Sequence, residues 1–256
     1  MKRKFEKEVA AGFKSEKSAL PEKLTTRDLQ HLPDPVKKYL HIVGAVGREK
    51  VRNVKITFEG KIRSKTNDGW MNLTAEQYSF FDNPLRIFYL RADKMKIPVF
   101  GLHLYKNAKA SMVVKLAGLI KIVNVNGAKM DMAETVTHFN DMCLLAPATL
   151  IDKNIKWNEI NPYKVEAEYT NGGNTISATL YFNKRGELFN FISTDRYDLS
   201  NAKAPVKYPF STPVSEYNNY GDFYLAGRAK TIYHKPQGDF CYGEFSIKSI
   251  EYNCKE

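Results

Sequence analysis

The sequence predicts a mainly β protein of the α+β class: a curved antiparallel sheet, or unclosed β-barrel, of about ten or eleven strands. Short runs of alternating apolar and polar residues, separated by turn residues, fill most of the chain after residue 52. Near residues 130–152 this pattern gives way to apolar residues at helical spacing. We therefore expect a helical lid in the middle of the chain and N-terminal helices before the strands.

The N-terminal part of the chain is predicted to be a helical arm at residues 1–47. Near its start, Phe5, Val9 and Phe13 recur at helical spacing within a charged segment at residues 2–18. A length of 256 residues is enough to bury a full-sized core, and large β units of this length are often single domains.

Residues 48–256 are predicted to form that domain, a single half-barrel with the helical insertion near 130–152. Its first strand has the sequence VKITFEGKIR at residues 54–63, in which apolar and polar side chains alternate. The strand at Leu85–Arg91 is instead apolar on both faces. Because such a strand has to be covered on both sides, it indicates a lid or an occupied cavity.

The predicted mid-chain helix has an apolar stripe formed by Met132, Val136, Phe139 and Cys143. We expect this stripe to press into the concave face of the sheet. Methionines such as Met142 suit surfaces that adapt to varied apolar partners, but ordinary core filling is favoured over a ligand-contacting role.

A polar stripe on the same helix contains Glu134, His138 and Asp141 at positions i, i+4 and i+7. Three interpretations fit it: a solvated helix face, a buried polar network that joins lid to sheet, or a catalytic or metal-binding site. No H-E-x-x-H motif or other recognised ligand spacing accompanies these residues, so no metal site is predicted. The three residues are the candidates for catalysis.

Ligand binding is expected from the apolar helix stripe together with large side chains of the strands. Tyrosine, with 15 residues, offers apolar area and a polar group together, although it is also a common strand residue. The candidate ligand-binding residues are Phe88, Met132, Val136, Phe139, Met142, Trp157, Tyr197, Tyr217 and Tyr242.

A second polar feature is the pair Asp195 and Arg196, adjacent near the end of a predicted strand. A structural ion pair that closes the strand is favoured over a substrate clamp. The residues expected in a structural polar network are Asn140, Asp141, Asp195 and Arg196.

Motifs of several enzyme classes are missing from the sequence. It has no G-x-S-x-G motif and no glycine-rich phosphate loop, and its three cysteines lack a metal-ligand spacing. No cofactor is therefore predicted, and an enzymatic function is less favoured than a binding function.

The net charge of +11 does not by itself predict nucleic-acid binding, because the lysines are spread along the chain and no recognition motif is present. A diffuse basic surface is typical of solubility or of attraction to anionic membranes. The expected partners are an apolar or amphiphilic small molecule and an anionic membrane surface, with no specific nucleic acid.

The N-terminal sequence MKRKFEKEVAAGF is basic but lacks the apolar core and cleavage site of a signal peptide. No apolar run approaches the roughly 20 residues of a membrane span. A cytoplasmic location is expected for the chain as written. A membrane-associated or extracytoplasmic location is expected instead if an N-terminal segment has been removed.

Five motifs, in one order, make the sequence resemble a bacterial family of unknown function over about Leu32 to Asn253. They are LPDPVKKYLHIVG (32–44), MAETVTHFNDMCLLAPATLID (132–152), IKWNEI (155–160), FISTDRY (191–197) and FCYGEFSIKSIEYN (240–253). No activity is implied by this resemblance. The residues to which the motif match draws attention are Glu134, Asn140, Asp141, Trp157, Asp195, Arg196 and Tyr197.

The same layout is similar to that of the bacterial lipoprotein-localisation factors, in which an unclosed β-barrel with a helical plug shelters acyl chains. Fold alone does not establish function. Three hypotheses follow: non-enzymatic binding of a lipid or other apolar ligand in the concave face, a hydrolase that uses Glu134, His138 and Asp141, or a structural domain whose core fills itself.

Overall fold

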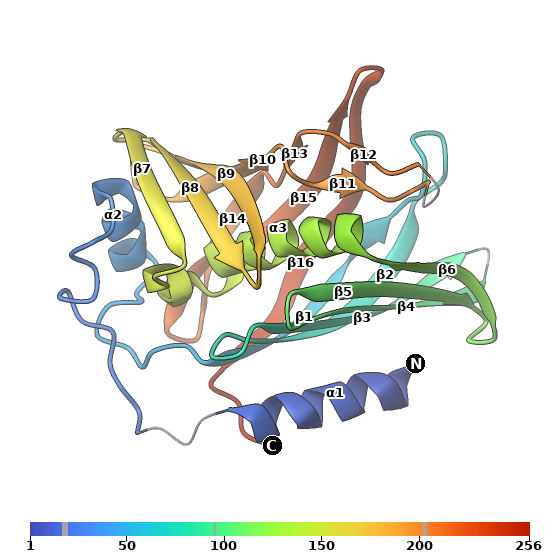
Figure 1. Cartoon of the computed structure of the whole chain (residues 1–256), viewed down its shortest axis with the longest axis horizontal. Coiled ribbons are helices and arrows are strands. Elements are labelled where there is room, and N and C mark those ends of the chain that lie inside the picture. The colour runs from blue at the N-terminus through green and yellow to red at the C-terminus, as the bar shows by residue number, and fades with distance from the viewer. Residues whose placement is uncertain (17–19, 95, 202–203) are drawn as a thin grey trace.

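One antiparallel sheet bends around the long helix α3 (Ala128–Leu145) in the computed structural model of the chain (Figure 1). The structure describes residues 1–16, 20–94, 96–201 and 204–256. The other helices are α1 (Lys2–Ser15), α2 (Asp34–Ile42) and the short 3-10 helix η1 (Pro147–Ile151).

The strands fall into two groups along the chain, one on each side of α3. Before α3 they are β1 (Asn53–Ile62), β2 (Met71–Phe80), β3 (Leu85–Lys94), β4 (Ile97–Lys106), β5 (Lys109–Leu116) and β6 (Ile120–Asn126). After η1 they are β7 (Ile155–Asn161), β8 (Lys164–Asn171), β9 (Asn174–Phe182), β10 (Leu188–Ser193), β11 (Tyr197–Asp198), β12 (Val206–Lys207), β13 (Phe210–Ser211), β14 (Val214–Tyr220), β15 (Phe223–Lys235) and β16 (Gly238–Tyr252).

The two groups form one sheet because β16 pairs with β1, so that the C-terminal strand joins the first strand. The strand order is β6-β5-β4-β3-β2-β1-β16-β15-β13-β10-β9-β8-β7, with β14 attached to β15 and with β11 and β12 paired separately. The end strands β6 and β7 do not pair with each other. The predicted fold class, a mainly β unclosed barrel, is confirmed.

The described residues contain sixteen strands, more than the predicted ten or eleven. The hairpin β5–β6 was missed because β6 is an exposed end strand, and such a strand lacks a regular alternation of buried and exposed residues. Its turn is formed by Ala117 and Gly118 at φ 50° and 73°. Strand β7 was missed for the same reason, since most of its side chains are exposed.

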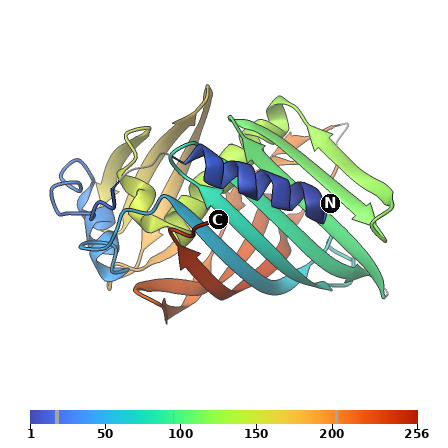
Figure 2. The ribbon, with the colours of Figure 1, turned by 90° about the horizontal axis from the view of Figure 1, so that it is seen from below.

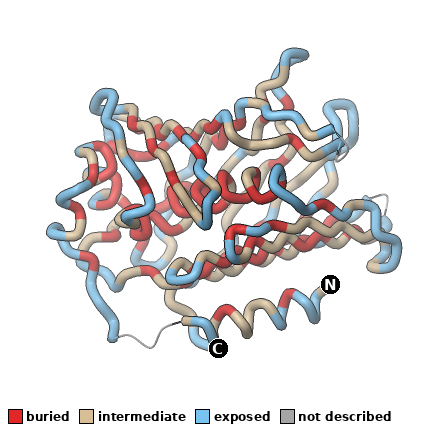
Figure 3. Tube along the Cα trace, in the orientation of Figure 1, coloured by how far each residue is buried: buried red, intermediate tan, exposed pale blue. Residues whose placement is uncertain are grey.

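Helix α3 lies inside the bend of the sheet, between the β1–β6 strands and the β7–β10 strands (Figure 1), and is buried along most of its length (Figure 3). Toward β7–β10, the ring of Phe139 stacks on Tyr169 with centroids 5.2 Å apart. Two hydroxyl groups bond to backbone oxygens at the end of the helix: Tyr39 to Cys143 at 2.9 Å and Tyr252 to Leu145 at 2.6 Å. The mid-chain helix is therefore on the concave side, as predicted.

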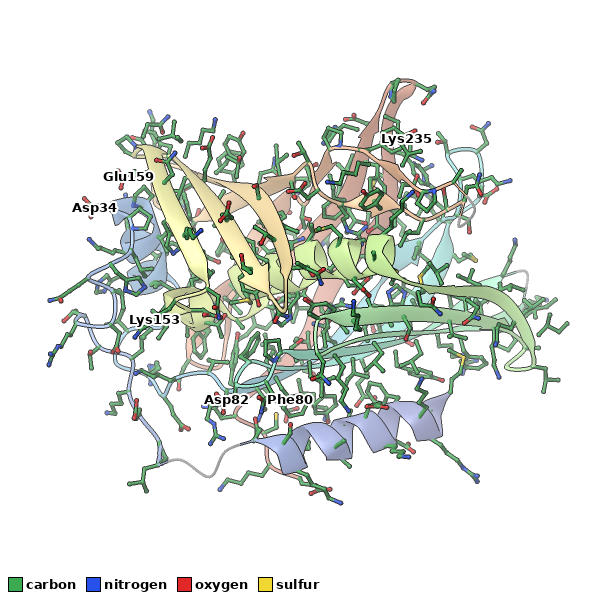
Figure 4. The ribbon with its side chains drawn as sticks, viewed as in Figure 1. Asp34, Phe80, Asp82, Lys153, Glu159 and Lys235 are labelled. Atoms are coloured by element: carbon green, nitrogen blue, oxygen red, sulfur yellow. The ribbon has the colours of Figure 1, made fainter. Side chains whose placement is uncertain are left out.

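Helix α1 covers the opposite, convex face of β2, β3 and β4 (Figure 2). Phe5 packs against Tyr78 and Tyr89, with ring centroids 6.0 and 5.6 Å apart, and Phe80 lies between the sheet and this helix (Figure 4). Strand β3 is apolar on both faces because α3 and its neighbours cover one face while α1 covers the other. Of the charged segment predicted at residues 2–18, residues 17 and 18 lie outside the described residues.

Helix α2 packs into the same apolar core as the sheet, where the ring of Tyr39 lies 5.6 Å from that of Phe182. At its start, the backbone N–H of Asp34 donates to the carboxylate of Glu159 on β7 at 2.9 Å (Figure 4). The domain boundary proposed at residue 47 stays a prediction. Within the described part of the chain, each helix is too short or too polar to cross a membrane.

The docking of α1 can be tested at Gly12, where an added Cβ would come within 2.3 Å of the Phe80 ring. We expect Gly12→Val to lower the free energy of unfolding by about 1–3 kcal/mol, because Phe80 is buried and cannot move aside. Hydrogen exchange of residues 2–15 should accelerate in the variant. The control Lys7→Val puts the same residue on the exposed side of α1 and should change little; equal effects of both variants would contradict the packing described.

Candidate functional site

A buried guanidinium links the concave face of the sheet to α3. Arg86 on β3 donates from Nε to Asp141 Oδ2 at 2.6 Å and from Nη1 to Glu134 Oε2 at 3.3 Å. Its Nη2 donates to Gln77 Oε1 on β2 at 3.0 Å, and Gln77 Nε2 in turn donates to Asp141 Oδ2 at 2.7 Å. Every nitrogen of the guanidinium therefore has a partner. We call Gln77, Arg86, Glu134 and Asp141 the Arg86 network.

Glu134 is charged within this network. Burial alone would raise the pKa of its carboxyl group, but the hydrogen bond with His103 and the positive charge of Arg86 lower this pKa to about 2. The Nδ1 atom of His103 lies 3.4 Å from Glu134 Oε1. Of the three interpretations of the polar helix stripe, the structure supports the buried network, because Glu134 is only 2% exposed and thus cannot be part of a solvated face.

His138 is one helical turn from Glu134 but is not part of the Arg86 network and lines a separate hollow. Its ring packs among the rings of Phe81, Tyr105 and Tyr169, and its buried Nδ1 has no hydrogen-bond partner. Burial, together with the positive charge of Arg86, lowers the pKa of His138 to about 3, so this ring is neutral. The candidate catalytic group of Glu134, His138 and Asp141 therefore does not converge.

A cavity of ≈ 150 Å³ lies between α3 and the concave face of the sheet, and its lining combines apolar and polar side chains. On the sheet side, the rings of Phe58, Phe88 and Phe245 lie 6.2–6.5 Å from one another, centroid to centroid. On the helix side lie Glu134, Asn140 and Asp141 together with the apolar Leu144 and Leu145, and the strands add the polar groups of Gln77, Arg86 and His103. The cavity also reaches the exposed residue Arg228, so it opens to solvent there.

Arg196 contributes a second guanidinium to this cavity. Its Cζ lies 4.5 Å from the ring centroid of Phe210, 5.5 Å from that of Tyr233 and 6.0 Å from that of Tyr242. Its Nη1 donates to the hydroxyl of Tyr233, while its buried Nε has no partner.

The ion pair expected between Asp195 and Arg196 is not formed in the described part of the chain. The carboxylate of Asp195 instead accepts hydrogen bonds from Lys207 Nζ at 2.9 Å and from the backbone N–H of Ser177 at 2.8 Å. The two residues lie between β10 and β11; Asp195 bonds to β9 and β12, whereas Arg196 lines the cavity.

Of the predicted ligand-binding residues, the structure brings Phe88 and Tyr242 to the cavity. Val136 and Phe139 are fully buried among other side chains of the core. The apolar stripe of α3 thus packs toward β7–β10, and the helix face that carries Glu134 and Asp141 lines the cavity. The stripe therefore does press into the concave face, on its β7–β10 part, while the Arg86 network holds the polar face of the helix toward β2 and β3.

The remaining predicted residues lie elsewhere. Met132 packs on the edge of the core, and Met142 lines a separate, open hollow of ≈ 340 Å³ next to His138. Trp157 lies on β7 with its ring 6.3 Å from Phe139, and Tyr197 lies beneath Lys129 and Lys207. The hydroxyl of Tyr217 donates to the backbone oxygen of Leu188 at 2.7 Å.

Several residues of the cavity were missed in the sequence, above all Gln77, Arg86 and His103 on β2, β3 and β4. One signal was present: Gln77 shares a strand face with Leu73 and Ala75, and Arg86 shares one with Phe88 and Leu90. A polar side chain on such a buried face needs hydrogen-bond partners. Among the described residues no group of three His, Cys, Asp or Glu side chains is arranged to hold a metal ion.

The bent sheet, the enclosed helix and the cavity define an unclosed β-barrel with an internal helix. The chain belongs to a family of unknown function (DUF6544), whose sequence profile matches residues 22–245. This confirms the resemblance that the five motifs indicated. No protein of curated function matches the chain significantly.

Solved structures that resemble this chain include lipoprotein-sorting domains. A domain described as an outer membrane lipoprotein-sorting protein from Vibrio parahaemolyticus is 9% identical, with a TM-score of 0.44 over 79% of this chain and 86% of that domain. A LolA superfamily protein from Nitrosomonas europaea is 8% identical, with a TM-score of 0.42 over 87% and 93%. A β-barrel-like protein of unknown function (DUF1849) from Brucella abortus is 8% identical, with a TM-score of 0.25 over 80% and 99%.

The neutral state of His138 predicts a pH dependence of stability. Its pKa is about 3 in the folded protein and 6.5 in a free side chain, so the unfolded chain binds more protons between these values. Stability is therefore lost as the pH falls below 6.5, by about 2 kcal/mol between pH 7 and pH 5. Urea unfolding at both pH values should show this loss in the wild type and not in His138→Phe. A loss of the same size in the variant would refute this assignment.

Because Arg86 is the centre of the network, its replacement should greatly reduce the stability of the fold. Arg86→Met leaves two carboxylates buried without their cation and should lower the free energy of unfolding by about 3–5 kcal/mol. The control Lys156→Met breaks an exposed ion pair with Glu168 and should cost less than about 1 kcal/mol. Denaturant titrations compare the two variants, and similar costs would show that the buried network does not anchor the helix.

Proposed function

We propose that the protein binds a lipid or similar amphiphile, without catalysis, in the cavity between α3 and the concave face of the sheet. The observation that carries this proposal is the mixed lining: the rings of Phe58, Phe88 and Phe245 border the same space as the charged groups of the Arg86 network. An amphiphile matches such a lining because it buries an apolar chain on one side and keeps polar contacts on the other.

The size of the cavity limits how much of a ligand it can hold. A protein cavity of about 150 Å³ accommodates a group the size of benzene. The space of ≈ 150 Å³ in this protein therefore suits a short length of one apolar chain, and the rest of the chain would extend through the opening near Arg228. The proposed ligand has a single inserted chain rather than a pair of acyl chains packed side by side.

The hydrolase alternative required Glu134, His138 and Asp141 to meet in one pocket. Two of these side chains bind Arg86 and line the cavity, whereas the third, His138, packs among aromatic rings and lines a separate hollow. This separation favours the binding proposal. The structural alternative, a core that fills itself, is an outcome of the experiment below.

Organic extraction and native mass spectrometry of gently purified protein test the proposal. We expect a bound amphiphile in the wild type and its loss in Ala229→Trp, which fills the cavity from its partly exposed wall. The control Lys230→Trp adds the same side chain at an exposed neighbouring position outside the lining. A clean apo mass, together with no uptake of fatty acids or phospholipids, would support the self-filled core instead.

We also propose that the hairpin β5–β6 contacts an anionic membrane surface. Its turn and edge carry exposed Leu119, Ile120 and Ile122, of which Leu119 is 82% exposed. The exposed Lys121 lies among them, and Lys94 lies at the same end of the sheet, beside the hairpin. Exposed apolar side chains next to lysines match the interface of an anionic bilayer. This end of the sheet projects away from α2 (Figure 1).

Co-sedimentation with vesicles containing phosphatidylglycerol tests the membrane contact. Replacing Leu119, Ile120 and Ile122 together by serine should lower the bound fraction at least about fivefold, because the apolar contact area is lost. A matched control replaces three exposed apolar residues of the β7–β10 half by serine, namely Ile160, Tyr163 and Phe189. Equal binding by both triple variants would contradict the assignment.

A further inference from the structure

Arg196 has no carboxylate counter-ion among the described residues. Three aromatic rings attract its guanidinium, but a ring face offers no oxygen acceptor, and within the described part of the chain its side chain hydrogen-bonds to the Tyr233 hydroxyl alone. Its Nε is buried without a partner, and none of the described carboxylates forms an ion pair with it. The two carboxylates that line the same cavity, those of Glu134 and Asp141, are hydrogen-bonded to Arg86.

Arg196 has a donor without a partner, and Asn140 has an acceptor without one. This residue of α3 is 6% exposed and lines the same cavity. Its Nδ2 donates to Thr212 Oγ1 at 2.6 Å, whereas its buried Oδ1 accepts no hydrogen bond. Buried polar atoms without partners are uncommon in folded proteins. The cavity therefore offers an unused donor on Arg196 and an unused acceptor on Asn140.

We propose that the amphiphile bound in this cavity has an acidic headgroup whose anionic oxygen pairs with Arg196, and a hydroxyl that donates to Oδ1 of Asn140. This inference rests on the proposed function and narrows its ligand class to acidic, hydroxyl-bearing amphiphiles. The acid is a carboxylate or a phosphate, since both present oxygens that match the fork of a guanidinium. The apolar chain of the ligand then lies against Phe58, Phe88 and Phe245.

Isothermal titration of wild-type protein with ten-carbon probes tests the headgroup. The probes are decanol, decanoate, 3-hydroxydecanoate, decyl phosphate and decyltrimethylammonium. We expect decanoate or decyl phosphate to bind about 10- to 100-fold more tightly than decanol, because a hydrogen bond to a charged group is formed. The ammonium probe should bind most weakly, and 3-hydroxydecanoate more tightly than decanoate. The ratio between decanoate and decyl phosphate identifies the acid.

Variants separate the two contacts. Arg196→Met should reduce the preference for acid over decanol to less than about threefold while decanol still binds. Asn140→Ala should keep the preference for acid and abolish the preference for the hydroxylated acid. The control Arg91→Met removes an exposed arginine of β3 outside the cavity and should leave all affinities unchanged. If Arg196→Met does not fold, Arg196→Lys replaces it, since losing the planar fork should also weaken the preference.

The outcomes distinguish this inference from the proposed function. Equal binding of decanol and the acids, or an acid preference that survives the Arg196 variant, would overturn the headgroup assignment and leave the lipid-binding proposal standing. Failure of every probe to bind, with no amphiphile in the purified protein, would overturn the proposed function itself.

Discussion

The position of α3 depends on one buried arginine. Arg86 reaches from the sheet to two carboxylates of the helix, Glu134 and Asp141, and thereby turns the polar face of α3 toward β2 and β3. Moving charges out of water is costly, so such a cluster persists only when its hydrogen bonds are satisfied. Those of the guanidinium are satisfied here, which fixes the rotation of the helix about its axis. The apolar stripe then packs on β7–β10, and the polar face borders a cavity.

Much of the fold could be predicted because local patterns of apolar and polar residues identify most of its strands and its long helix. The alternation in residues 54–63 identifies a strand, and the two-faced apolar pattern of Leu85–Arg91 requires cover on both sides. Local patterns cannot say what supplies that cover. Helix α1, which covers the convex face, precedes β3 by about seventy residues, and its Phe5 contacts Tyr78 and Tyr89 through tertiary packing that no local pattern reveals.

The site was less predictable, because its residues meet through long-range pairing. Phe58 and Phe245 share the cavity wall because β1 pairs with β16, although they are almost two hundred residues apart in the chain. A helix buried on nearly all sides also gives no reliable sign of which face meets a ligand. Arg196 stood out in its motif, but its sequence neighbour Asp195 was taken as its partner, whereas Asp195 pairs with Lys207 and Arg196 lines the cavity.

The two arginines of the cavity have different surroundings. We therefore assign Arg86 to the stability of the fold and Arg196 to ligand recognition. Arg86 is neutralised by two carboxylates of the protein, so its N–H donors are already bonded to protein groups. Arg196 is held by three rings and one phenol, which orient the guanidinium without neutralising it. A cation that is oriented but not paired, beside an unpaired amide oxygen of Asn140, is prearranged for a polar group that the chain itself does not supply.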